Sequence, residues 1–329
     1  MTVAEHPLRQ ALWPLGLLYG GVTALRNGLY SAGLLRRFGV DVPVVSIGNL
    51  TVGGTGKTPT VAWLCRLARR CGRRPGVLAR GYGRAPGAEL NDEGLMLQRR
   101  LPELLQEQDP DRVAGARRLV AKGADYIVLD DGFQHRRLAR DLDVVCIDAL
   151  RPFGNGHCLP AGPLREWRTG LRRASVVLLT RASGLDPEQI EARRQRVRAL
   201  ARNPALPVQA CEHAAGEVLV EPAGATHPAA ELGGRRVVLM SAIARPQSFR
   251  DTVEALGAEV VGERIHRDHH RFTAAEAEAA VAAARAADAT LLVTEKDDAK
   301  LAAFGLERSV LRIELRFLER EPEPAEFLL

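Results

Sequence analysis

From residue 40 onward, short uninterrupted apolar runs alternate with longer segments whose apolar residues recur at helical spacing. The short runs are typical of strands buried on both faces, and the longer segments are typical of amphipathic helices. Strands that alternate with helices in this way form a largely parallel sheet with helices on both faces. The predicted strands span residues 42–47, 75–79, 126–129, 143–147 and 175–179, and the predicted helices span 59–71, 95–105 and 110–122.

A second α/β pattern follows near the C-terminus, with predicted strands at 236–240, 259–262 and 290–294 and predicted helices at 246–256 and 274–287. At 329 residues the chain exceeds what one hydrophobic core usually organises. We therefore expect a core domain over 40–204 and a smaller α/β domain over 228–329 that closes over the active site. The segment 205–227 is rich in Pro, Gly and small polar residues, which favours a connector.

The N-terminal segment, residues 1–39, has a different character. Its stretch 11–25 (ALWPLGLLYGGVTAL) carries no charge, and a second apolar patch covers 28–35. The uncharged stretch is shorter than the roughly 20 residues of a spanning helix, and no signal-peptide cleavage pattern follows it. We predict a membrane-associated helix that lies in the interface, with packing on the protein's own core as the main alternative and a transmembrane span as a less favoured one. Its interfacial residues are Trp13, Tyr19, Arg26, Arg36 and Arg37.

The strongest local motif is TVGGTGKT at 51–58, between an apolar strand and an amphipathic helix. Glycines allow backbone N–H groups to converge on phosphate oxygens at a helix N-terminus. Lys57 can reach the β- and γ-phosphates of a nucleotide, and the Thr58 hydroxyl can ligate Mg²⁺. Thr51 stands where the usual P-loop pattern has glycine. The motif predicts a P-loop NTPase-like core with a bound nucleotide.

Two carboxylates, Asp130 and Asp131, end the predicted strand at 126–129. In an open α/β sheet the carboxyl ends of the strands face the ligand, so this pair is expected near the nucleotide phosphates and Mg²⁺. The alternative interpretation is a carboxylate pair that starts a turn before Gly132.

Composition narrows the function classes. The formal net charge is +6, which is compatible with an anionic membrane surface, a phosphorylated substrate or nucleic acid. Aromatic residues make up only 5% of the chain, and the basic run HRRLAR at 135–140 has no aromatic stacking stripe, so we expect no nucleic-acid partner. The five cysteines show no CxxC spacing and no zinc-site pattern, which indicates reduced thiols.

Several motifs in a fixed order resemble the tetraacyldisaccharide 4′-kinase (lipid A 4′-kinase) family. The resemblance spans residue 8 to about residue 300 and implies that ATP phosphorylates the 4′-hydroxyl of a tetraacylated disaccharide 1-phosphate. It also implies a location at the cytoplasmic face of the bacterial inner membrane, with a glycolipid substrate and no obligate protein partner. The motifs are SIGN (46–49), VGGTGKTP (52–59), RGYG (80–83), NDEG (91–94), DDGFQH (130–135), GPLRE (162–166), DHH (268–270) and TEKD (294–297).

The resemblance also implies roles for individual residues. Asp92 would accept the proton of the sugar hydroxyl, and His269 would orient it as an Asp–His dyad that forms only when the domains close. The family usually has Gly-Asp-Glu-Pro where this chain has NDEG, so the local turn is expected to differ. The residues implied for ATP are Thr51, Gly53, Gly54, Thr55, Gly56, Lys57 and Thr58. Those implied for Mg²⁺ are Thr58, Asp130, Asp131 and Glu166, with Asp131 the more important acid. Lys57 and Asp131 are implied in catalysis, and the residues implied for the substrate are Asn49, Arg80 and Arg165.

Three alternatives stay open. His266, His269 and His270, with Asp268 among them, could form a metal site instead of a dyad. The TEKD motif either closes over the nucleotide or caps the helix that follows it. The chain as a whole could be a P-loop ATPase that acts as a switch or assembly factor at the membrane.

Overall fold

A computed structural model describes residues 12–84, 87–268 and 270–328. By its internal contacts the chain divides into two compact units. The first unit comprises Met1–Tyr82, Glu103–His213 and Leu315–Leu329, and the second comprises Gly83–Pro102 and Ala214–Glu314. Each unit is described by itself.

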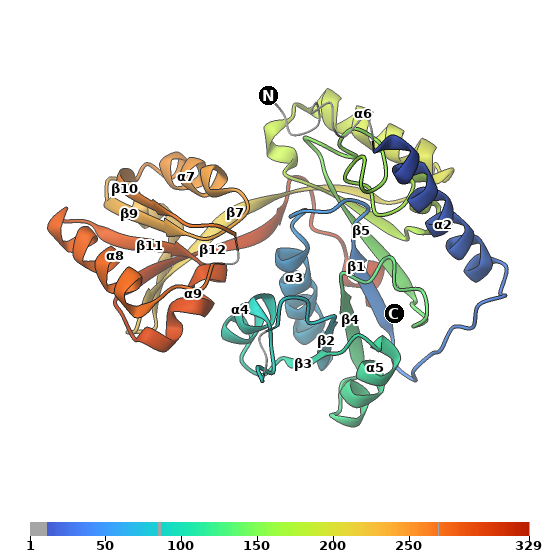
Figure 1. Ribbon diagram of the computed structural model, residues 1–329, viewed down its shortest axis with the longest axis horizontal. Helices are drawn as coiled ribbons and strands as arrows, with labels where there is room; N and C mark the ends of the chain where they lie inside the picture. The colour runs from blue at the N-terminus through green and yellow to red at the C-terminus, as the bar shows by residue number, and fades with distance from the viewer. Residues whose placement is uncertain (1–11, 85–86, 269, 329) are drawn as a thin grey trace. The chain divides into compact units, whose positions relative to one another are not determined.

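The first unit contains a parallel sheet in the order β7-β6-β5-β1-β4-β2-β3, with β1 near the middle (Figure 1). Strands β1, β4 and β6 are apolar nearly throughout because helices and loops cover both faces of the sheet. Its strands are β1 (Val44–Gly48), β2 (Pro75–Ala79), β3 (Leu105–Gln108), β4 (Tyr126–Asp130), β5 (Leu142–Asp148), β6 (Val176–Thr180) and the first part of β7 (Val208–Glu221); its helices are α2 (Trp13–Ser31), α3 (Lys57–Arg70), α5 (Arg112–Ala121) and α6 (Pro187–Ala201), with short 3₁₀ helices at Arg168–Arg173, Ala182–Gly184 and Pro324–Glu326.

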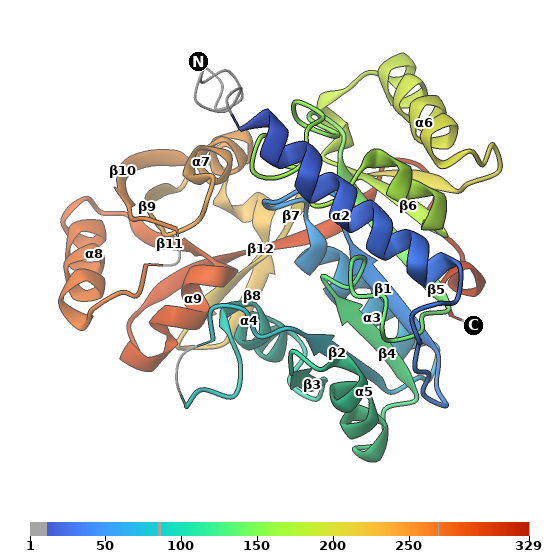
Figure 2. The ribbon, with the colours of Figure 1, turned by 45° about the vertical axis from the view of Figure 1, so that its right-hand side comes forward.

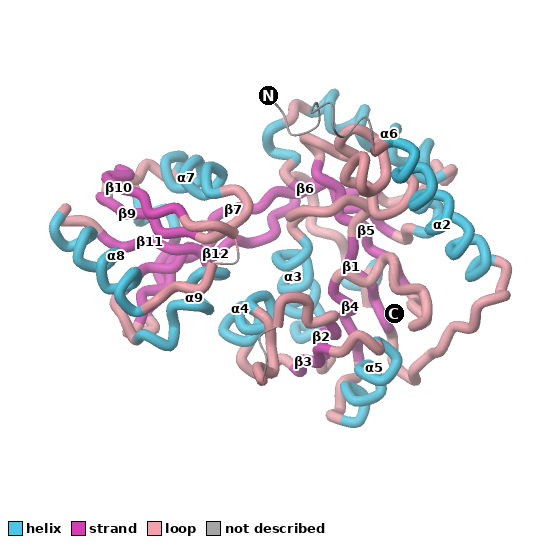
Figure 3. Tube along the Cα trace, in the orientation of Figure 1, coloured by secondary structure: helices cyan, strands magenta, loops and turns pink. Residues whose placement is uncertain are grey.

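In the second unit the strands follow in the order β10-β9-β11-β12-β7 (Figure 3). Strand β8 pairs with β7 in the antiparallel direction. One apolar cluster packs α8 on the sheet and another packs α7 on it. The strands are the rest of β7, β8 (Ala225–Pro228), β9 (Arg236–Ser241), β10 (Glu259–Ile265), β11 (Thr290–Thr294) and β12 (Arg308–Phe317); the helices are α4 (Asp92–Arg100), α7 (Pro246–Ala255), α8 (Ala274–Ala286) and α9 (Glu295–Leu301), with 3₁₀ turns at Ala229–Leu232 and Ala302–Phe304.

The predicted α/β class with a mostly parallel sheet is confirmed. The segment 205–227, predicted as a connector, forms the long strand β7 and the start of β8, and the chain passes from the first unit to the second within β7, between His213 and Ala214. Small residues such as Ala214 and Gly216 obscure the alternation of apolar and polar residues that is typical of a strand. Glycine fits at 216 because a Cβ there would meet the Glu314 side chain at 2.7 Å. Strands β3 and β12 were also missed, although apolar and charged residues alternate along the second half of β12.

Helix α4 belongs to the second unit and not to the predicted core range of 40–204. Its last residues explain this assignment. Arg99 pairs with Asp298 at 2.9 Å, and Arg100 pairs with Glu295 at 3.1 Å and with Glu314 at 3.0 Å. The carboxylates of the C-terminal elements therefore hold a helix that precedes them by about two hundred residues of sequence.

Helix α2 lies along the outside of the first unit (Figure 2). It packs through a narrow face, because a Cβ at Gly16 would lie 2.9 Å from Ala161 and one at Gly20 would lie 2.5 Å from the Trp167 ring. Most of its large apolar side chains are exposed, with Leu18 and Leu25 at 66% each. Within the described residues, no helix combines the length and apolar content that a membrane crossing requires.

Candidate active site

The phosphate-binding loop connects β1 to α3 in the first unit. Gly56 is the N-cap of α3 and adopts φ 81°, and Gly53 adopts φ 105°, both in the region that favours glycine. Gly56 is also fixed by packing, since a Cβ there would lie 1.9 Å from the His213 ring. The predicted strand–loop–helix arrangement around Lys57 is therefore present.

Side chains from outside the loop hold its backbone. The Asn49 amide donates to Thr55 Oγ1 at 2.8 Å, and the Thr180 hydroxyl donates to the Thr55 carbonyl at 3.0 Å. Gln134 Nε2 donates to the Asn49 carbonyl at 2.9 Å. Asn49 is fully buried, so the residue predicted to contact substrate supports the loop in this structure.

Arg181 supports the loop from the end of β6. Its guanidinium donates to the Gly54 carbonyl and pairs with Asp148 at 2.7 Å. The His213 ring packs against Gly56. Burial lowers the pKa of His213 to about 4, and the positive charge of Arg181 contributes to this shift. A neutral imidazole therefore contacts the loop at neutral pH. Sequence reasoning missed both residues because no local pattern marks them.

Asp131 connects two cations at the end of β4. Lys57 Nζ lies 3.4 Å from Asp131 Oδ1, and Arg165 Nη1 donates to Asp131 Oδ2 at 2.7 Å. Burial alone would raise the pKa of Asp131, but Lys57 and Arg165 hold it below the usual value. Asp131 also has φ 52°, an uncommon backbone conformation for a residue other than glycine. The structure thus brings together three of the predicted site residues.

The register of the sheet places Asp130 directly beside Ile47, next to the start of the loop. The Asp130 and Asp131 carboxylates and the Thr58 hydroxyl are hard oxygen donors of the kind that Mg²⁺ prefers. These residues fit a magnesium ion at the phosphate end of the loop.

Glu166, the fourth predicted magnesium ligand, has a different environment. It is almost fully buried and accepts hydrogen bonds from Asn27 at 2.7 Å, Gln134 at 2.9 Å and Arg173 at 2.9 Å. Both carboxylate oxygens are therefore engaged by N–H donors. Glu166 links α2 to Gln134, and Gln134 in turn holds the phosphate-binding loop through Asn49. Sequence reasoning missed Asn27 as part of this chain of contacts.

Arg112 lies within the electrostatic reach of the acidic pair and of Arg80. Arg80 is exposed just after β2, and Arg112 is buried at the start of α5. Burial and the charge of Arg80 lower the pKa of Arg112 to about 10, whereas Asp130 and Asp131 oppose this change. Arg112 is thus a buried cation in the field of the acidic pair, and sequence analysis did not single it out.

Asp92 is the first residue of α4 in the second unit. The Asn91 side chain caps this helix by accepting from the Gly94 backbone N–H at 3.0 Å, which explains how NDEG starts a helix without the proline of the family motif. Lys300 Nζ lies 4.0 Å from Asp92 Oδ2, and only 6% of the Lys300 side chain is exposed. A buried ammonium group therefore faces the predicted catalytic carboxylate.

Lys300 is itself held by buried groups. It donates to Asp297 Oδ1 at 3.1 Å and to the Ala242 carbonyl at 3.4 Å, and it lies 5.7 Å from the centre of the Phe272 ring. Asp297 is fully buried and also accepts from the Ala242 N–H at 3.1 Å and from the Thr294 hydroxyl at 2.7 Å.

The TEKD motif is part of this arrangement. Thr294 is the N-cap of α9 and its side chain accepts from the Asp297 N–H. Glu295 accepts from Arg100 at 3.1 Å and from the Ile313 N–H at 3.1 Å. Of the two alternatives for this motif, capping of the following helix is the one observed.

His269, the predicted partner of Asp92, lies outside the described residues. Asp92 lies in Gly83–Pro102, which clusters with the second unit and not with the predicted core. The Asp92–His269 dyad and its formation on domain closure stay predictions.

Comparison with known proteins agrees with these motifs. Residues 8–329 match the family described as tetraacyldisaccharide-1-P 4′-kinase, LpxK. A tetraacyldisaccharide 4′-kinase from Anaeromyxobacter dehalogenans is 47% identical over 318 residues, covering 91% of this chain and 79% of that protein. One from Syntrophotalea carbinolica is 38% identical, covering 93% and 87%.

Among solved structures, LpxK from Aquifex aeolicus in complex with ATP superposes with a TM-score of 0.76 at 28% identity. The match covers 94% of this chain and 95% of that one. The similarity thus extends over both units, beyond the phosphate-binding loop that many unrelated proteins share. The chain belongs to the LpxK family and is a phosphotransferase, a tetraacyldisaccharide 4′-kinase of lipid A biosynthesis.

Proposed function

We propose that this chain transfers the γ-phosphoryl group of ATP to the 4′-hydroxyl of a tetraacyldisaccharide 1-phosphate, with Mg²⁺, at the cytoplasmic surface of the inner membrane. The observation that carries the proposal is the cluster of Lys57, Asp131 and Arg165 at the phosphate-binding loop. Family membership and the ATP bound to the Aquifex aeolicus relative support it.

Residues 51–58 would bind the nucleotide. The backbone of the loop and the N-terminus of α3 attract phosphate oxygens, and Lys57 turns from Asp131 toward the β- and γ-phosphates. When bound, Mg²⁺ would supply positive charge that offsets the negative charge of the transferring phosphate. Thr58 and the Asp130/Asp131 pair would hold it, whereas Glu166 would act indirectly by keeping Gln134 and the loop in place.

The acceptor hydroxyl must lose its proton as the new phosphate ester forms. Asp92 would accept that proton, and His269 remains the candidate that orients it. Lys300 would hold the Asp92 carboxylate in place. Because the transferring group passes through a loose transition state, alignment of hydroxyl and phosphate matters more than the strength of the base. Arg80 and Arg165 would contact the anionic groups of the substrate.

Helix α2 would place the protein at the lipid surface. Leu15, Leu18, Val22 and Leu25 expose apolar surface that an interfacial helix buries among acyl chains. The same helix contacts Glu166 through Asn27 and the Gln134 carbonyl through Arg26. A helix embedded among lipid chains would therefore be joined directly to the support of the phosphate-binding loop.

The direct test is incubation of purified protein with γ-labelled ATP, Mg²⁺ and the disaccharide 1-phosphate in mixed micelles. We expect label on the lipid with wild-type protein and none with Lys57→Ala. Lys122→Ala, which removes a lysine from the exposed pair with Glu107, is the matched control and should retain activity. Release of free labelled phosphate without labelled lipid would instead favour the switch ATPase.

The membrane part has a separate test. Leu18→Asp should reduce binding to vesicles of anionic lipid by about 10- to 150-fold, since it removes roughly 1.5–3 kcal/mol of apolar burial. Leu150→Asp changes another exposed leucine of the first unit and should leave vesicle binding unchanged. Equal binding by both variants would rule out α2 as the contact.

A further inference from the structure

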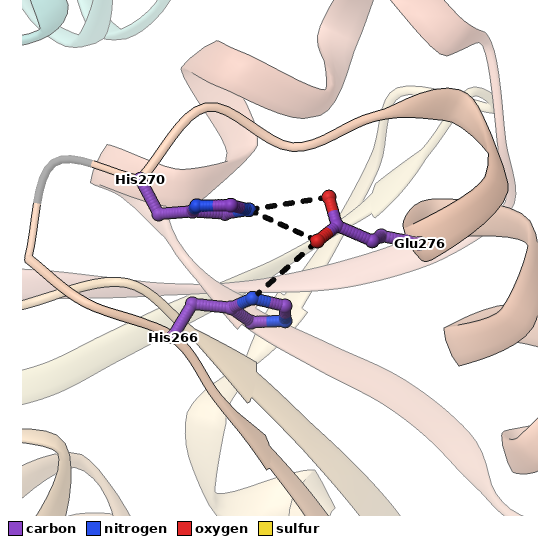
Figure 4. Close-up of side chains that lie close together, drawn as sticks. All are labelled: His266, His270 and Glu276. Carbon is purple, nitrogen blue, oxygen red and sulfur yellow. Dashed lines mark hydrogen bonds and ion pairs between the residues drawn. The ribbon is translucent and has the colours of Figure 1, made fainter.

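Three metal-ligating side chains of the second unit lie close together (Figure 4). His266 follows β10 directly, His270 lies in the segment before α8, and Glu276 lies in the first turn of α8. His270 Nε2 lies 3.1 Å and 3.2 Å from the two Glu276 oxygens, and His266 Nδ1 lies 3.9 Å from Glu276 Oε1. One ligand atom from each residue falls within 4.8 Å of the other two.

These separations suit a tetrahedral cation. Zn²⁺ bonds to imidazole nitrogen and carboxylate oxygen at about 2.0–2.1 Å, so two ligand atoms of a tetrahedral site lie roughly 3.3–3.4 Å apart. The nitrogen–oxygen distances of 3.1–3.9 Å lie on both sides of this value. Two imidazoles and one carboxylate are a ligand set that leaves a fourth position open to water.

The surroundings position the ligands before any ion binds. Glu276 accepts from the Thr273 backbone N–H at 2.8 Å and from the Thr273 hydroxyl at 3.0 Å. These bonds and the contact with His270 fix the orientation of the Glu276 carboxylate. Both imidazole rings also pack edge-on against Phe272, with ring centres at 5.2 Å and 5.5 Å. Outer contacts of this kind orient metal ligands in proteins.

The ligand set differs from the metal alternative that the sequence suggested. Asp268 is paired with Lys296 at 3.2 Å and is not one of the three clustered ligands, and no sequence pattern pointed to Glu276. A magnesium ion would not select this site, because Mg²⁺ prefers oxygen ligands whereas imidazole suits Zn²⁺ and its neighbours.

We propose that His266, His270 and Glu276 form a binding site for a divalent transition metal, with Zn²⁺ as the best fit. Its two imidazoles and one carboxylate differ in kind from the oxygen donors that we propose for Mg²⁺. Binding displaces any proton from the two coordinating nitrogens and replaces the His270–Glu276 hydrogen bond with bonds to the metal. The proposal does not depend on the identity of the kinase substrate.

The test is titration of the purified full-length protein, free of affinity tag, with Co²⁺ as a visible probe for the zinc site. We expect one equivalent of Co²⁺ to give the intense visible absorption of a tetrahedral ion, and Zn²⁺ but not excess Mg²⁺ to abolish it. Glu276→Gln should weaken Co²⁺ binding by at least about tenfold. This variant keeps the capping box at the start of α8, so loss of binding would not reflect loss of the helix.

His266→Ala should weaken binding to a similar extent. His227→Ala is the matched control. His227 lies in the same unit and pairs with Glu231 at 3.5 Å, but it is not part of the three-residue cluster of described ligands. It should bind Co²⁺ like the wild type. The proposal is overturned if wild-type protein shows no tetrahedral spectrum, or if Glu276→Gln and His266→Ala both bind Co²⁺ as tightly as the control. In that case the three side chains only cap and brace α8.

Discussion

One lysine–aspartate pair in each unit shows two ways of holding a charge. In the first unit, Lys57 pairs with Asp131, and their side chains are 16% and 37% exposed. In the second unit, Lys300 pairs with Asp297, and their side chains are 6% and 0% exposed. A phosphate can replace Asp131 as the partner of Lys57 without leaving a buried charge, whereas breaking the second pair leaves one. Lys57 can thus exchange Asp131 for a phosphate, whereas Lys300 and Asp297 stay paired and have a structural role.

The largest effect is expected at the exchangeable pair. Lys57→Ala removes the cation that stabilises the transferring phosphate, and kcat/KM for ATP should fall by about 10³-fold or more. Because Lys57 is partly exposed, the free energy of unfolding should change little. Steady-state kinetics and urea denaturation on the same preparation measure both quantities. A variant that loses stability in proportion to activity would show that Lys57 is structural.

The buried pair should respond in the opposite way. Lys300→Met leaves the Asp297 carboxylate without its cation, and the free energy of unfolding should fall by about 3–5 kcal/mol. The double variant Lys300→Met/Asp297→Asn removes both charges and should recover part of this loss. Urea denaturation of the single and double variants measures the coupling. If the losses in the free energy of unfolding caused by Lys300→Met and Asp297→Asn are additive, the two side chains do not stabilise each other and the structural role that we assign to the pair is wrong.

Asp92 lies between these two extremes, since it is near Lys300 but partly exposed. Asp92→Asn should lower kcat by about 10²-fold while KM for ATP stays close to that of the wild type, because the carboxylate acts on the acceptor hydroxyl. Glu93→Gln alters the neighbouring carboxylate and serves as control. Normal turnover by Asp92→Asn would remove Asp92 from the proposed mechanism.

The smallest effect is expected at His213, whose neutral imidazole packs against the phosphate-binding loop. His213 has a folded pKa of about 4, below the ordinary value of about 6.5, so the unfolded chain binds more protons between these pH values. The stability contributed by neutral His213 is present above pH 6.5 and is lost as the pH falls toward 4, at up to about 1 kcal/mol per pH unit. His213→Gln should flatten this part of the stability curve. The exposed His227→Gln should not, and equal slopes in both would contradict the assignment.

Several parts of the fold and site could be predicted from the sequence. The strands β2 and β11 appear at the predicted residues, and the phosphate-binding loop lies between β1 and α3 as its motif indicated. The acidic pair at the end of β4 also lies beside this loop. These features depend on residues close together in the chain, so periodicity and short motifs are sufficient to find them.

Other parts were decided by contacts between distant segments. Asn49 and Glu166 were expected at the substrate and the metal, but their buried partners make them supports of the loop. Glu276 was missed because its two histidine neighbours reach it only after β10 and α8 are in place.

The sequence by itself determined the alternation of strands and helices, the glycines of the phosphate-binding loop and the types of side chain available for chemistry. These follow from backbone conformation and local hydrophobic spacing, which act over a few residues. Only the tertiary structure decided that Gly83–Pro102 joins the second unit, that Lys300 faces Asp92, and which carboxylates are already occupied. Ion pairs and burial depend on distances between segments far apart in the chain, and those distances exist only once the chain has folded.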